Sequence, residues 1–266
     1  MKRVLSSAII LPIALIVFVL GNKYIVDVFL SLISILCIYE LFNAFEQKGH
    51  HPVKWVGYIA AIAICFLHII PKERILMLIG AIIPTSVLLL FILTITKKTK
   101  TNVIDIAITF FGVCYTVIFL IFVSLIRQMP NGVWLIWYVF LTSWGTDVFA
   151  YLVGKAIGKH HFTDISPKKT IEGCIGGTIG AIICVMIYSI ILNIFVHIDI
   201  NYIVMFIASI LLSIIGQIGD LSASVIKRYA GIKDYSNLIP GHGGMLDRID
   251  SVLFIAPFAY FILLLI

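Results

Sequence analysis

The amino-acid sequence predicts an all-α, polytopic integral membrane protein with about nine transmembrane helices. Hydrophobic residues make up 61% of the 266 positions and charged residues only 12%; roughly 25% of the residues in soluble proteins are charged. A soluble domain of this length could not bury so much apolar surface. The apolar residues also gather in runs long enough to cross a bilayer, which takes about 20 residues.

Nine apolar segments follow one another along the chain. In a bilayer each must be helical, because every backbone N–H and C=O needs a partner within the segment. The third segment is short, and Pro71 marks a break after it. The segments cover about 4–21, 24–44, 55–70, 75–95, 103–126, 133–157, 173–197, 201–226 and 246–266.

The basic residues predict the orientation. With nine crossings, 15 of the 19 Lys and Arg fall at the amino terminus and around every second connection. Basic residues mark the cytoplasmic side, so we expect a multi-pass protein of the cell membrane with a cytoplasmic amino terminus. The predicted regions are 1–130, with about five spans, and 131–266, a candidate catalytic region with cytoplasmic loops at 158–172 and 227–246.

Composition and cysteine placement argue against several classes of protein. The five cysteines lie within or at the ends of apolar runs and form no CxxC pair, so neither a disulfide framework nor a zinc site is expected. No polar surface with interleaved aromatic and basic residues is large enough to bind nucleic acid. The basic start and first apolar run resemble a signal peptide, but no small-residue cleavage pattern follows, and we expect a retained helix.

The eighth segment carries a polar stripe. Its members are spaced four, three, four and three apart, so they share one face of an α-helix. A carboxylate within a bilayer costs about 2.5–3.5 kcal/mol, which favours a stripe that faces the protein interior or a wet cavity. Hydrogen bonding between helices is the structural alternative. The stripe consists of Ser213, Gln217, Asp220, Ser224 and Lys227.

The sixth segment carries a weaker stripe, formed by Ser143, Asp147, Tyr151 and Gly154. Asp147 is the residue of interest in it. Its carboxylate could bind a ligand, pair with a Lys or Arg near the site, or serve a structural role, and the sequence leaves these alternatives open.

The segment 224–250 concentrates charge in an otherwise apolar chain. Glycines at 241, 243 and 244 surround His242, and glycine lets the backbone approach a ligand closely. Backbone N–H groups entering a helix can bind phosphate. Asp247 and Asp250 lie three apart, on one helix face, where an ordinary charged helix end with an Asp–Arg pair is the alternative.

Together these features indicate a metal and a polyphosphate. Asp220 lies near the end of one expected helix and Asp247 at the start of the next, and Mg²⁺ often takes one or two carboxylates with phosphate oxygens and waters. The bases of the connection would neutralise phosphate charge; they are Lys227, Arg228, Lys233 and Arg248. The loop around Lys169 adds a second basic cluster on the same predicted side.

At this point the residues resemble a known family, the phosphatidate cytidylyltransferases or CDP-diacylglycerol synthases. The first half of the chain is similar only in being several hydrophobic helices, and Ile171 stands where an aromatic is expected. The matching motifs are Ser224-x-Ile226-Lys227-Arg228, Lys233-Asp234, His242-Gly243-Gly244-x-x-Asp247-Arg248-x-Asp250, Gln217-x-Gly219-Asp220, Asp147-x-x-Ala150-Tyr151-x-x-Gly154 and Ser166-Pro167-x-Lys169-Thr170-x-x-Gly173.

The resemblance implies a reaction of CTP with phosphatidic acid that gives CDP-diacylglycerol and pyrophosphate for phospholipid biosynthesis, at a site facing the cytoplasm. It implies that Asp220 and Asp247 hold Mg²⁺, which in the family can be joined by K⁺. The expected partners are the two substrates, the bilayer and a second copy of the chain, without nucleic acid. The expected catalytic residues are Asp220, Asp247, Lys227 and Arg228, and the expected substrate-binding residues are Ser224, Lys233, His242, Gly243, Gly244, Arg248, Lys169 and Asp147.

Other functions compete with this interpretation. A related CTP-dependent enzyme could make CDP-archaeol or phosphorylate a polyprenol. A cation-coupled transporter could use the same aspartates, but the charge lies on one predicted side and no inverted repeat with broken helices is evident. A scaffold would have no use for the HGGxxDR motif. For an intramembrane aspartyl protease we expect a glycine where Gln217 stands.

Overall fold

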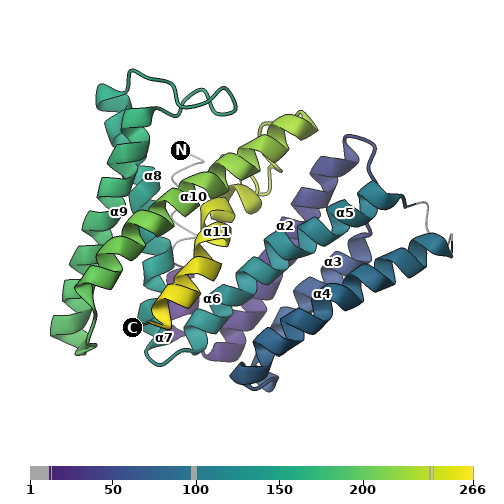
Figure 1. Cartoon of the computed structure of the whole chain (residues 1–266), viewed down its shortest axis with the longest axis horizontal. Coiled ribbons are helices and arrows are strands. Elements are labelled where there is room, and N and C mark those ends of the chain that lie inside the picture. Colours follow the sequence, from purple (N-terminus) through teal and green to yellow (C-terminus); the bar gives the residue numbers. More distant parts are fainter. Residues whose placement is uncertain (1–11, 13, 97–100, 240, 242, 266) are drawn as a thin grey trace. The chain divides into compact units, whose positions relative to one another are not determined.

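The computed structural model describes residues 12, 14–96, 101–239, 241 and 243–265, and these residues form an all-helical protein (Figure 1). No strand occurs among them. Isolated bridges join His161 to Thr170 and Ile239 to Gly243. The elements are α2 (Lys23–Glu46), α3 (Lys54–Ala63), η1 (Ile64–Ile69), α4 (Lys72–Ile95), α5 (Val103–Gly112), η2 (Val113–Ile118), α6 (Phe119–Gln128), α7 (Gly132–Leu135), α8 (Trp137–Ile157), α9 (Ile171–Ile191), η3 (Leu192–Val196), α10 (Tyr202–Ala230) and α11 (Leu246–Leu263).

The helices agree with the expected apolar segments from 24 onward. Pro71 ends the third segment as expected and caps α4. The first segment, 4–21, falls largely on residues outside those described. Within the part of the chain that the structure describes, five helices are long and apolar enough to cross a membrane, which supports the predicted fold class, while the count of nine stays a prediction. The five are Lys23–Glu46, Val103–Gln128, Gly132–Ile157, Ile171–Val196 and Tyr202–Ala230.

One boundary prediction was wrong. The eighth segment was expected to end at 226, but α10 continues to Ala230, so Lys227 and Arg228 are helical. Basic side chains suit the last turn of a helix, where they interact with the carbonyl end of its dipole. The helix ends where Gly231 adopts φ = +75°, a conformation that favours glycine. Asp220 therefore lies about three turns before the helix end and not at it.

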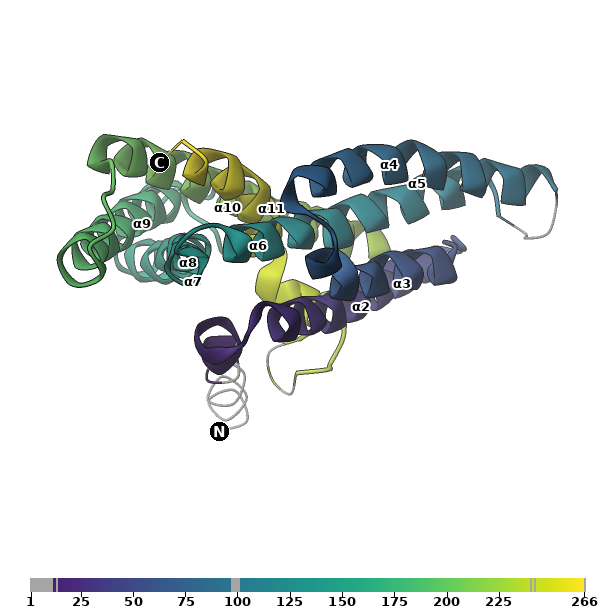
Figure 2. The same ribbon diagram turned by 90° about the horizontal axis from the view of Figure 1, so that it is seen from below.

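The chain divides into two compact units, and the first comprises Met1–Leu125 and Tyr229–Arg248. In it α2 packs against α3 and η1, and α5 packs against α2 and α4 (Figure 2). Its interior contains an unexpected polar cluster, in which buried Asp27 accepts hydrogen bonds from His68 and Ser124. The connection between α10 and α11 also belongs to this unit.

The second unit comprises Ile126–Arg228 and Ile249–Ile266. Its centre is the pair α8 and α9, which lie side by side along their length (Figure 1). Glycines on α9 allow this close approach: a Cβ at Gly180 would lie 2.2 Å from Cγ of Phe149, and one at Gly176 would lie 2.5 Å from Cβ of Val153. Small residues at a helix interface are typical of membrane proteins.

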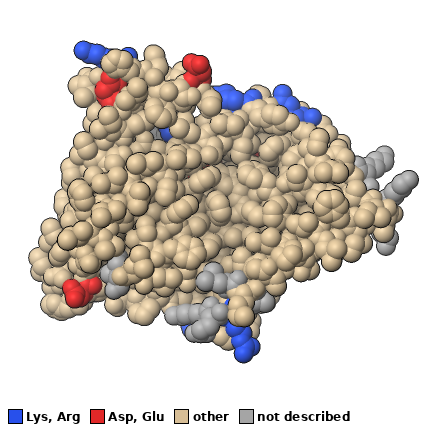
Figure 3. Space-filling model, viewed as in Figure 1, with Lys and Arg blue, Asp and Glu red and all other residues tan. Residues whose placement is uncertain are grey.

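Helix α10 completes the second unit. Thr146 on α8 hydrogen-bonds Ser213 on α10 at 2.8 Å. On its other side, a Cβ at Gly219 would lie 2.8 Å from the carbonyl oxygen of Asp250. Figure 3 shows that uncharged residues make up most of the face drawn and that few charged side chains appear on it.

Candidate active site

The connection 158–170 is shaped by groups at the start of α9. Thr170 caps this helix, its hydroxyl accepting a hydrogen bond from the Gly173 amide at 3.1 Å. The carboxylate of Glu172 hydrogen-bonds Nδ1 of His160 at 2.6 Å and accepts the backbone N–H groups of Lys159 and His160 at 3.2 and 3.3 Å. These bonds fold the connection back on α9 and determine where Lys168 and Lys169 lie.

Lys169 reaches from this connection to α10. Its Nζ lies 2.5 Å from Oδ2 of Asp220, and the two side chains are 23% and 30% exposed. One turn earlier, Nε2 of Gln217 donates to the carbonyl of Cys174 at 3.2 Å and to the hydroxyl of Thr178 at 3.1 Å. Ser213, Gln217 and Asp220 thus share one face of α10, as their spacing predicted. The structure adds that this face contacts α9 and the connection before it, and that Ser213 and Gln217 hydrogen-bond between helices, as the structural alternative expected.

A cavity of about 230 Å³ opens beside this ion pair. It contains two carboxylates and two lysines among small and polar neighbours, so it suits an anionic ligand with an associated cation. It brings together three of the predicted site residues, Asp147, Lys169 and Asp220. The cavity is lined by Thr146, Asp147, Ala150, Tyr151, Lys168, Lys169, Thr170, Gly173, Cys174, Gln217 and Asp220.

Further along α10 lie three more predicted site residues. Ser224 is buried and Lys227 half-buried. Arg228 is exposed, and its Nε donates to the carbonyl oxygen of Ile165 at 3.3 Å. Arg228 therefore also supports the connection that carries Lys169, a role that the sequence did not suggest.

The remaining predicted residues lie in the first unit, around the glycine-rich connection. Oδ2 of Asp247 accepts the backbone N–H groups of Tyr235 and Gly244, both at 2.9 Å. Gly243 is buried with φ = +86°, a conformation that L side chains rarely adopt. Lys233 and Arg248 are exposed at either end. His242 lies outside the described residues.

The predicted metal ligands Asp220 and Asp247 belong to different units, and their shared centre stays a prediction. Within the described part of the chain, no three His, Cys, Asp or Glu side chains gather so that they could hold a metal ion. One or two carboxylates together with ligand and water oxygens form a donor set that Mg²⁺ accepts and zinc does not favour.

Two residues that no sequence pattern singled out have prominent places in the structure. Lys168 lines the cavity beside Lys169, but nothing distinguished it from an ordinary loop lysine. Glu40, in the apolar helix α2, is 1% exposed and accepts three hydrogen bonds, two from the connection before α11 and one from the first residue of α11. A carboxylate inside a predicted span is costly, and this signal was available in the sequence.

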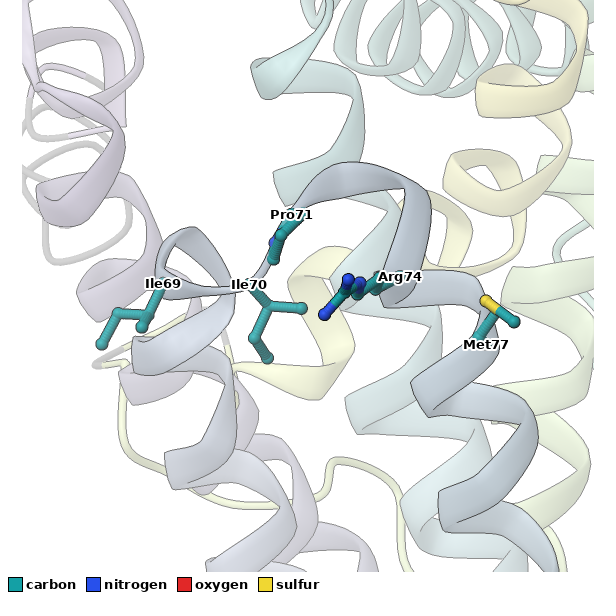
Figure 4. A pocket seen from close by; sticks show the side chains of 5 residues that line it. All are labelled: Ile69, Ile70, Pro71, Arg74 and Met77. Carbon is teal, nitrogen blue, oxygen red and sulfur yellow. The ribbon is translucent and has the colours of Figure 1, made fainter.

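A second cavity, of about 510 Å³, lies where η1 joins α4. Figure 4 shows Ile69, Ile70, Pro71, Arg74 and Met77 around it. The residues described in its lining supply one guanidinium and otherwise apolar side chains, whereas the smaller cavity beside Lys169 is lined by two carboxylates and two lysines. The smaller cavity beside Lys169 is the better candidate for chemistry.

Comparisons with known proteins show which family the whole chain resembles. A family model described as "Cytidylyltransferase family" matches residues 1–266. A phosphatidate cytidylyltransferase of Staphylococcus aureus (strain COL) is 32% identical over 262 residues, which cover 97% of this chain and 96% of the relative. The phosphatidate cytidylyltransferase of Bacillus subtilis (strain 168) is 33% identical over 186 residues, 68% of this chain and 66% of the relative. A third, from Staphylococcus haemolyticus (strain JCSC1435), is 33% identical over 259 residues, 96% of this chain and 95% of the relative.

Proposed function

Since the chain belongs to the cytidylyltransferase family, we propose that it transfers the cytidylyl group of CTP to phosphatidic acid in phospholipid biosynthesis. A phosphate oxygen of phosphatidic acid attacks the α-phosphorus of CTP. A new P–O bond forms while the bond to the oxygen bridging the α- and β-phosphorus breaks, and pyrophosphate leaves with the bonding electrons. The attacking oxygen is already anionic, so the reaction needs no strong general base.

The observation that carries this proposal is the cavity beside the Lys169–Asp220 ion pair. This small cavity is lined by two lysines and two carboxylates that come from otherwise apolar helices and the connection before α9: Lys168, Lys169, Asp147 and Asp220. A lysine held by a carboxylate is already oriented when a phosphate arrives. On binding, the lysines would neutralise phosphate charge and stabilise the charge that develops on the leaving group.

The proposed cofactor is Mg²⁺, which K⁺ can accompany, held by Asp220 and Asp247. Their carboxylate oxygens, completed by phosphate oxygens and water, fit the donor preference of Mg²⁺. Both aspartates also bind protein groups: Asp220 pairs with Lys169, and one oxygen of Asp247 accepts two backbone N–H groups. When bound, the metal would neutralise phosphate oxygens of the nucleotide.

The proposed phosphate-binding residues are Ser224, Lys227, Arg228 and Lys233. The first three follow Asp220 along α10, which supports a continuous binding surface on that helix. Gly243 and Gly244 offer backbone groups, and we propose that His242 and Arg248 assist binding.

We further propose nine crossings, a cytoplasmic amino terminus and an active site open to the cytoplasm in the cell membrane. The unequal distribution of Lys and Arg supports this topology. It lets CTP enter from the cytosol while phosphatidic acid arrives from the bilayer. A homodimer is the proposed assembly; it follows from the family resemblance.

The test is pyrophosphate release by purified protein in mixed micelles with Mg²⁺. We expect release from CTP only when phosphatidic acid is present, and little from ATP, GTP or UTP. Archaeal ether-lipid phosphate and polyprenol are offered as alternative acceptors. A preference for either would reassign the substrate, and ion-driven uptake into vesicles without pyrophosphate release would contradict the proposal.

A further inference from the structure

Glu40 connects the first half of the chain to the glycine-rich connection. It lies on α2, more than 190 positions from its partners, and is 1% exposed. Its Oε1 accepts the hydroxyl of Ser236 at 2.6 Å and the backbone N–H of Met245 at 2.9 Å. Its Oε2 accepts the backbone N–H of Leu246 at 2.8 Å. Both carboxylate oxygens are therefore used to hold this connection.

The two hydrogen bonds from backbone N–H groups provide acceptors for donors at the start of α11. This helix begins at Leu246, and the first N–H groups of a helix have no partner within it. A carboxylate at this end also interacts favourably with the helix dipole. The three hydrogen bonds to its two oxygens offset the cost of burying this polar side chain.

The absence of a side chain at Gly244 lets the backbone come close to this carboxylate. A Cβ at Gly244 would lie 2.6 Å from both oxygens of Glu40, closer than real contacts allow. The Gly244 amide itself donates to Asp247. Three successive amides, of Gly244, Met245 and Leu246, are thus bound by two carboxylates, Asp247 and Glu40. The contact defines the backbone path between the proposed phosphate-binding glycines and the proposed metal ligand.

Residues at and just after the end of α2 also contact Tyr229, in the last turn of α10. Nε2 of His50 lies 2.7 Å from the hydroxyl of Tyr229, and their rings stack with an angle of 15° between planes. Phe45 packs against both rings, with centroids 6.3 and 5.9 Å away. Tyr229 and the residues just before Asp247 are therefore both attached to α2 or to the residues that directly follow it.

We propose that Glu40 is a positioning residue of the transferase: it fixes the backbone of residues 243–247 so that Gly243, Gly244 and Asp247 meet the nucleotide phosphates and metal. This role rests on the proposed function, because it assigns those residues to the active site. It also gives the amino-terminal helices a part in catalysis without contact between Glu40 and substrate.

The test combines hydrogen exchange with turnover. Glu40→Ala removes the acceptor for three donors, whereas Glu40→Gln keeps the size and one acceptor oxygen. The control is Glu46→Gln, because Glu46 lies on the same helix but pairs with Lys54 at 2.7 Å. Deuterium uptake is measured over 235–248, and pyrophosphate release is followed with CTP and phosphatidic acid. Detergent-solubilised protein is checked for folding by its thermal midpoint.

We expect faster exchange in 243–247 and a fall in kcat of about 10- to 100-fold for Glu40→Ala, because small misplacements of reacting groups have large effects on rate. Glu40→Gln should lie between it and the wild type, and Glu46→Gln should match the wild type in both measurements. If Glu40→Ala does not fold, Glu40→Gln carries the test.

The inference is overturned if the Glu40 variants take up deuterium over 243–247 as fast as the wild type does and keep a kcat within about twofold of the wild-type value. If the wild type itself releases no pyrophosphate, the proposed function fails, and the exchange measurement still decides whether Glu40 fixes the connection. The two failures therefore give different results.

Discussion

Nζ of Lys169 lies 2.5 Å from Oδ2 of Asp220, joining the connection before α9 to the middle of α10. The ion pair is partly exposed, so its contribution to stability should be small. Its importance is positional. It neutralises a carboxylate in an apolar helix and holds an amine at the edge of the cavity, where we expect Lys169 to exchange Asp220 for a nucleotide phosphate during binding.

Lys169→Met should reduce turnover strongly while leaving the protein folded. The substitution keeps most of the side-chain length but removes the charge that orients phosphate, and we expect a loss of about 10²-fold or more in kcat/KM for CTP. Lys159→Met is the matched control, because Lys159 is exposed in the same connection and does not line the cavity. Equal activity of the two variants in pyrophosphate release would contradict the assignment.

Asp220→Asn and Asp247→Asn should each abolish most activity. The residual activity should require a higher Mg²⁺ concentration than the wild type needs. Loss of one carboxylate charge weakens a hard cation site. An Asn at 247 retains an oxygen that can accept from Tyr235 and Gly244, so the connection should stay formed. The measurement is a Mg²⁺ titration of pyrophosphate release, with EDTA for metal removal.

Asp199→Asn provides the control for this titration, since Asp199 is an exposed carboxylate between η3 and α10. Its Mg²⁺ dependence should equal that of the wild type. Wild-type activity in both aspartate variants would remove the metal centre from the mechanism.

Gly180→Ala should destabilise the protein, whereas Gly80→Ala should not. The new methyl at 180 would meet the Phe149 ring, but nothing lies within 4 Å of a Cβ at Gly80. Overpacking costs about 1–3 kcal/mol, while replacing an exposed helical glycine by alanine gains up to about 1 kcal/mol. Thermal unfolding in detergent compares the two. A lower midpoint for Gly80→Ala than for Gly180→Ala would contradict the α8–α9 packing.

Thr170→Ala should cost about 1 kcal/mol of stability, because it removes the side-chain cap of α9. It should also lower activity by a few-fold, since the neighbouring Lys169 would lose a fixed backbone. Thr170→Ser retains the hydroxyl and should restore both properties. Thermal unfolding and pyrophosphate release of the three proteins are compared; an identical loss in the Ser variant would show that the methyl group, and not the cap, is what matters.

The helices and many candidate residues could be predicted because their signals are local. Apolar runs locate the helices, and the spacing of Ser213, Gln217 and Asp220 determines which face they share. The end of α10 differs from the end of the apolar segment at 226, because a helix continues until its backbone is interrupted, here at Gly231. Glu40 was missed because it is a single charge without a nearby motif.

The sequence by itself determined the membrane character, the helical fold class and the charged segments around Lys169 and Asp247, since these follow from composition and from neighbours along the chain. Only the tertiary structure decided which distant groups meet. Two sets of contacts depend on how the helices pack and on which acceptors lie near buried donors. They are the ion pair of Lys169 with Asp220 and the hydrogen bonds of Glu40 with Met245 and Leu246. Periodicity gives the face of a helix but not its partner, and partners are selected by close packing and by the cost of leaving a buried polar group unpaired.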